Sequence, residues 1–183
     1  MSALVVAGVL LLYGCSSTNS PSTQSASTST NIDRSTFASA VCGSITAWMN
    51  RMVDTTNSFS DDSPKLSVPA RRDRYVAAFD TLTALTVDLQ SQLGQAPEKG
   101  TTQADAGAVR SELTKAGDLI KTQIAGNRAE AGGLSDAAYG FQAVNDGHLF
   151  TGTEKALSTM LKALNEQGRA HALPELEGTC GRR

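Results

Sequence analysis

Apolar residues recur at intervals of three and four along most of the chain, and this period predicts α-helices rather than strands. The first such stretch runs from Phe37 to Met52, and Asp33 or Ser35 is expected to cap its start. Segment 57–64, NSFSDDSP, has the composition of a loop and is expected to end this helix. Its apolar positions are Phe37, Val41, Ile45, Trp48 and Met52.

Two further stretches have the same pattern. A second helix is expected to begin near Pro69, a residue tolerated in a first turn, and to end before Gly94. A loop at 95–100 leads to a third, which is expected to end at the Gly126-Asn127 signal or at the break at 131–133. Their apolar positions are Tyr75, Phe79, Leu82, Leu85 or Thr86, Leu89 and Leu93, then Val109, Leu113, Ala116, Ile120 and Ile124.

The C-terminal part predicts one irregular and one regular helix. Segment 134–150 is less periodic, with a turn expected at Asp146-Gly147. Thr151 and Glu154 fit a capping box, which predicts a last helix from about Thr153 to Gln167, followed by a short tail. No alternating strand pattern interrupts these segments. The sequence therefore predicts an all-α fold, an up-and-down bundle of four to five helices.

The start of the chain differs from the rest. Residues 3–13 are apolar and uncharged but shorter than the ~20 residues that span a bilayer, as in the core of a signal peptide. The sequence that follows, Leu12-Tyr13-Gly14-Cys15, resembles the lipobox of bacterial lipoproteins. That resemblance implies a signal peptide at 1–14 and acylation, for example with palmitate, of Cys15. The alternatives are an ordinary cleaved signal or a buried apolar strand.

Ser and Thr make up 11 of the 15 residues at 16–30, and the segment contains no large apolar side chain. Such a segment cannot bury enough apolar surface to offset the entropy of ordering. We therefore expect a tether over 15–35 with a reach of ~25 Å, followed by one domain over 36–183. This arrangement would hold the domain at a cell membrane, outside the cytoplasm.

Cysteine parity supports the same interpretation. An exported protein with three cysteines would have one thiol left over, and lipidation of Cys15 removes it. Cys42 and Cys180 are then expected to form a disulfide between the first helix and the C-terminal tail, worth on the order of 5 kcal/mol in a chain-entropy account. The alternative, a nucleophilic cysteine, would need a neighbouring base.

The charge balance points to no particular partner. The chain has 18 Asp and Glu against 16 Lys and Arg, so we expect no nucleic-acid binding. The basic turn at Arg71, Arg72 and Arg74 is either a solvated helix face or a patch for anionic headgroups.

The polar residues form no recognisable catalytic or metal motif. His148 and His171 are not spaced as metal ligands, so neither a metal site nor a cofactor is expected. Cys42-Gly43-Ser44 is not a nucleophile elbow, and Asp61-Asp62 has no calcium-loop spacing. Trp48 lies on an apolar stripe and is expected to be a core residue.

Taken together, the lipobox, the tether, the cysteine near the start of the first helix and the cysteine near the end resemble small envelope lipoproteins of actinobacteria such as mycobacteria. The resemblance implies a lipid-anchored envelope protein and assigns no binding residue. We expect a non-enzymatic module that binds an envelope protein or an amphiphile. The alternative is an envelope enzyme, hydrolase-like, whose site the sequence does not reveal. An apolar groove would favour binding, and a polar cleft would favour catalysis.

Overall fold

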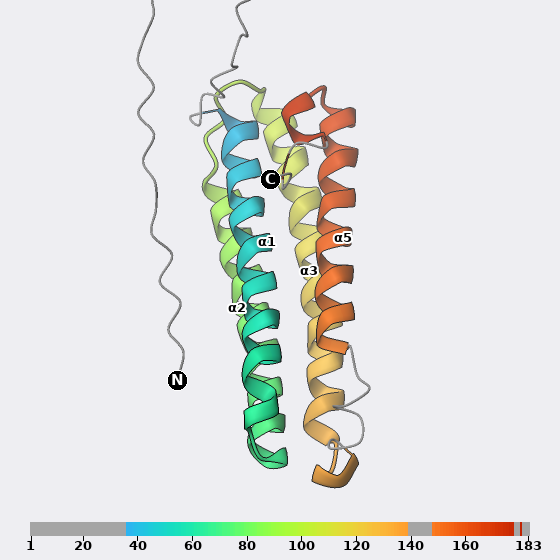
Figure 1. Cartoon of the computed structure of the whole chain (residues 1–183). Helices are drawn as coiled ribbons and strands as arrows, with labels where there is room; N and C mark the ends of the chain where they lie inside the picture. Colours follow the sequence, from blue (N-terminus) through green and yellow to red (C-terminus); the bar gives the residue numbers. More distant parts are fainter. Residues whose placement is uncertain (1–35, 139–147, 178–179, 181–183) are drawn as a thin grey trace, which may run out of the picture. The chain divides into compact units, whose positions relative to one another are not determined.

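The computed structural model describes residues 36–138, 148–177 and 180. The chain divides into two compact units, Met1–Asn31 and Ile32–Arg183, and all described residues belong to the second. The described part of that unit is a bundle of four long helices in which successive helices run in opposite directions (Figure 1). The described ranges contain no strand. The predicted all-α, up-and-down bundle is therefore confirmed.

Helix α1, Phe37–Asp62, begins one residue after Thr36, whose side chain accepts a hydrogen bond from the Ser39 N–H. Its predicted apolar stripe is buried from end to end. The loop predicted at 57–64 is wrong, because α1 continues through most of that segment. The cause is tertiary packing: the ring of Phe59 is buried against Tyr75 of the next helix, 5.1 Å between centroids.

The 3-10 turn η1, Ser63–Lys65, joins α1 to α2, Val68–Gln95, which has Pro69 in its first turn as predicted. All the predicted apolar positions of α2 are buried, including both Leu85 and Thr86. The Thr86 hydroxyl accepts a hydrogen bond from the Trp48 indole N–H at 3.4 Å. Trp48 is thus a core residue with a satisfied polar atom, as expected.

Helix α3, Gln103–Gly133, is capped by Thr102, whose hydroxyl accepts from the Asp105 N–H. The helix passes through the stop signal at Gly126-Asn127 and ends at the predicted glycine pair. Its last turns are held in helical form by buried Ala131 and by the ion pair of Arg128 with Asp80 of α2.

Helix α5, His148–Ala170, begins earlier than predicted. Thr151 lies inside it, so the capping box is wrong, and Thr153 is instead buried with its hydroxyl 2.9 Å from that of Thr56 on α1. Of the irregular segment expected at 134–150, residues 136–138 are helical and 148–150 belong to α5. Residues 139–147, with the expected turn at 146–147, lie outside the described residues.

The tail closes one end of the bundle. After α5 it forms the 3-10 turn η2, Pro174–Leu176, and Leu176 is fully buried. The predicted disulfide is present: Cys42 of α1 and Cys180 are bonded, with their Cα atoms 5.1 Å apart. The bond holds the tail against the start of α1, at the end of the bundle that contains Thr36. We call this the closed end.

Candidate interaction surface

The sequence-predicted site residues are distributed as follows. Cys15 lies outside the described residues, and Cys42 and Cys180 meet in the disulfide. The side chain of His148 is not among those described. His171 lies at the closed end, where its Nδ1 is 2.7 Å from Asp105 Oδ1.

The contact between His171 and Asp105 connects the C-terminal end of α5 to the N-terminal end of α3. The Asp105 carboxylate also accepts a hydrogen bond from the Thr102 hydroxyl at 2.6 Å. The hydrogen bonds from Thr102 and His171 lower the pKa of Asp105 below its ordinary value. The Asp105 carboxylate thus joins the N-terminal end of α3 to the C-terminal end of α5, which indicates a structural role for it.

The basic turn of α2 is occupied by contacts within the protein. Arg71 donates to the backbone carbonyls of Ser63 and Leu66. Arg72 pairs with Asp136, and Arg74 pairs with Asp62 of α1. These guanidinium groups fasten the end of the bundle opposite the closed end.

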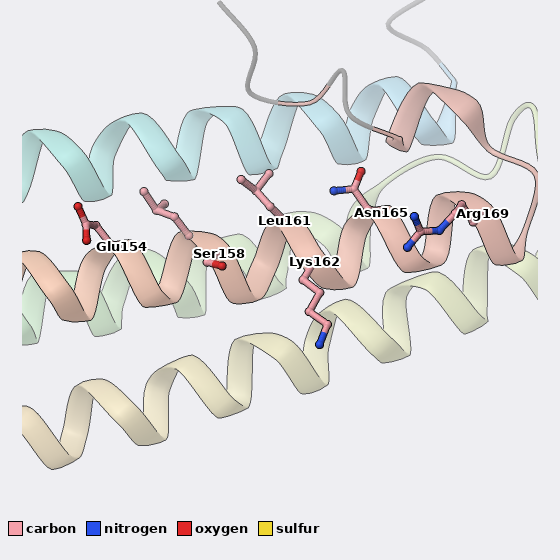
Figure 2. A pocket seen from close by; sticks show the side chains of 7 residues that line it. Glu154, Ser158, Leu161, Lys162, Asn165 and Arg169 are labelled. Carbon is pink, nitrogen blue, oxygen red and sulfur yellow. The ribbon is translucent and has the colours of Figure 1, made fainter.

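The outer face of α5 has a different character. It carries an open hollow of about 810 Å³ whose described lining comes entirely from this helix. Figure 2 shows the polar lining residues along its length, with Leu161 and Asn165 pointing toward the α1 side and Lys162 toward the α3 side. The lining residues are Glu154, Leu157, Ser158, Leu161, Lys162, Asn165 and Arg169.

Leu157 and Leu161 form the apolar centre of this surface. Both are half-buried and pack against the core with one side, which leaves the other side open to solvent. Phe150 precedes Leu157 by seven residues on the same helix and is 39% exposed. Leu157, Leu161 and Phe150 thus give the outer face of α5 an apolar strip bordered by charged residues.

Three exposed cations, Lys155, Lys162 and Arg169, follow one another at intervals of seven residues along α5. We call them the cation stripe. Within the part of the chain that the structure describes, they make no ion pair or hydrogen bond. All other Lys and Arg side chains in those ranges have a partner. The interval of seven is visible in the sequence, and our sequence interpretation missed it.

The described residues contain no group of His, Cys, Asp or Glu side chains that could hold a metal ion. None of the described helices combines the length and apolar character that crossing a membrane requires. Comparison with known protein families, curated proteins and solved structures gives no match to this chain.

Proposed function

We propose that the chain is a lipid-anchored protein of a bacterial cell envelope whose helical bundle binds another envelope protein through the outer face of α5. The observation that carries the binding role is the hollow centred on half-buried Leu157 and Leu161, with exposed charged residues along it. The anchoring role rests on the lipobox-like sequence that ends at Cys15 and on the Ser/Thr-rich segment after it.

The bundle interior supports a binding surface rather than an internal ligand. The apolar stripes of all four long helices meet in one continuous core, and the side chains that fill it are fully or almost fully buried. A protein with such a core presents its binding groups on the outside. Its partner is therefore expected to contact a helix face.

The anchor is tested by metabolic labelling with an alkyne analogue of palmitate in the native bacterium. We expect label on the full chain and on Cys180→Ser, and no label on Cys15→Ser. Labelling of the Cys15→Ser protein equal to that of the unchanged chain would show that Cys15 is not the acylated residue.

The binding role is tested by placing a photo-crosslinking amino acid at Ser158, an exposed position inside the hollow. Ser111, an exposed serine on α3, is the matched control. We expect a discrete adduct with one envelope protein from position 158 and none from position 111. If the two positions give the same adducts, α5 has no special role.

A further inference from the structure

The cation stripe gives the α5 surface a defined geometry. Seven residues of α-helix correspond to two turns and a rise of ~10.5 Å, so the three charges lie almost in a straight row about 21 Å long. They are exposed, and within the described residues they make no ion pair or hydrogen bond. A complementary molecule must therefore present negative charge at the same repeat.

The apolar residues of the surface also form a row along the axis of α5. Phe150, Leu157 and Leu161 follow the helix axis on the edge of α5 that turns toward α1, since they are spaced by seven and four residues. The described lining of the hollow combines Leu157 and Leu161 with two of the cations, and Ser158 provides a small side chain between them. The two rows lie about a third of a turn apart around α5 and flank its exposed side, so an amphipathic helix lying along that side can contact both.

We propose, on the premise that the proposed function holds, that α5 docks an acidic amphipathic helix of a partner protein. The apolar side chains of the partner lie on Leu157 and Leu161. Its carboxylates lie opposite the cation stripe, each pairing with a group that has no partner among the described residues. The added helix extends the bundle by the same packing that holds α1, α2, α3 and α5 together.

The distribution of charge favours a helix over an anionic membrane. Glu154 and Glu166, both exposed, lie on α5 next to cations of the stripe. A bilayer surface of uniform negative charge would repel these carboxylates, whereas a helix can place different side chains opposite each position. A second copy docked through the same face would set one cation stripe against another, which is unfavourable.

The test uses the full chain with Cys15→Ser and synthetic peptide helices of about three heptads. One peptide carries a Leu stripe flanked by Glu at every seventh position, and a second carries Lys in place of Glu. We expect the acidic peptide to bind at least about tenfold more tightly than the basic one, measured by fluorescence anisotropy.

Two variants with the same change in net charge locate the site. Lys155→Glu with Lys162→Glu should weaken binding of the acidic peptide by about tenfold or more. Lys115→Glu with Lys121→Glu, on α3, should leave it unchanged, because these lysines pair with Glu112 and Asp118. Leu161→Gln should also weaken binding, with circular dichroism to verify that the variant is folded.

Equal binding of the two peptides, or equal effects of the two double variants, would overturn the proposal. Binding to phosphatidylglycerol vesicles through the stripe, without binding to the acidic peptide, would replace the partner helix with a membrane. A discrete crosslink from position 158 in the bacterium, together with no binding of the acidic peptide, would refute this inference alone. No crosslink would refute the proposed function itself.

Discussion

The interface between α2 and α3 and the outer face of α5 carry similar polar and charged side chains. In the interface these side chains are paired, and on α5 the cations are not. Between α2 and α3, Gln90 donates to the Thr114 carbonyl and to Asp118, 2.9 and 3.0 Å away. Arg128 pairs with Asp80 across the same two helices. On α5, the cation stripe has no such partners.

The glycine at position 117 shows how closely α2 and α3 fit. A Cβ atom there would lie 2.8 Å from Nε2 of Gln90, the side chain that bridges the two helices. The comparison teaches that the polar side chains between α2 and α3 are used within the fold, whereas the three α5 cations have no partner among the described residues.

The largest effect on stability is expected from the disulfide at the closed end. Reduction, or Cys42→Ser with Cys180→Ser, should lower the free energy of unfolding by about 2–5 kcal/mol, because the unfolded chain regains the entropy of a long loop. Thermal unfolding with and without reductant measures this. An unchanged melting temperature would show that buried Leu176 alone holds the tail.

A smaller effect is expected at the glycines of α3. Gly117→Ala should destabilise by about 1–2 kcal/mol, since Gln90 must move and lose hydrogen bonds. Gly107→Ala is the matched control, because no atom lies within 4 Å of the added Cβ, and it should stabilise by up to about 1 kcal/mol. Urea denaturation of both variants measures the change in the free energy of unfolding. A change of the same sign in both would contradict the close packing at Gly117.

The buried threonine pair between α1 and α5 should show coupling. Thr56→Val and Thr153→Val should each cost about 1 kcal/mol, because each leaves the other hydroxyl without its cross-helix partner. The double variant should cost less than the sum of the two by roughly 0.5–1 kcal/mol. A double-mutant cycle by urea denaturation measures this, and strict additivity would show that the hydroxyls act independently.

Low pH should weaken the polar contacts between α2 and α3. The pKa of Asp80 is lowered by its hydrogen bond from Arg128, and that of Asp118 by its hydrogen bonds from Gln90 and Lys121. A lowered pKa in the folded state stabilises the fold above the unfolded value of about 3.9, and this contribution is lost as the pH falls through the folded value.

We therefore expect the free energy of unfolding to decline as the pH falls below about 4. Asp80→Asn with Asp118→Asn should flatten this decline, measured by urea denaturation at a series of pH values. The same slope in the wild type and the variant would assign the acid sensitivity to other carboxylates, such as Asp105.

The helical stripes and the disulfide could be predicted from the sequence, whereas several helix ends could not. A buried stripe repeats over several turns, so its period is visible even when single residues deviate. A helix end depends on one or two residues, and tertiary contacts decided two of the ends that were predicted wrongly. Packing of Phe59 on Tyr75 stabilises α1 through a segment of loop-like composition. The ion pair of Arg128 with Asp80 stabilises α3 beyond Gly126.

The candidate surface was only partly accessible from the sequence. The interval of seven between Lys155, Lys162 and Arg169 can be read directly. What distinguishes these cations is that the other cations of the described ranges have partners, and those partners often lie on another helix, as with Arg51 and Asp88. Such pairs join residues far apart in the chain, so only the folded structure shows which charges remain unpaired.

The central claim is that the α5 cations serve binding and the cross-helix arginines serve stability. One measurement separates the two: the free energy of unfolding in urea with and without the acidic peptide. At ten times its Kd the peptide should add about 1.4 kcal/mol to the wild type, since it binds only the folded state.

We predict that Lys155→Glu with Lys162→Glu keeps the stability of the free protein and loses the stabilisation by peptide. Arg51→Glu with Arg128→Glu, which has the same change in net charge, should lose stability and keep the stabilisation by peptide. If the α5 variant lost as much stability as the arginine variant, or still gained stability from the peptide, the claim would be contradicted.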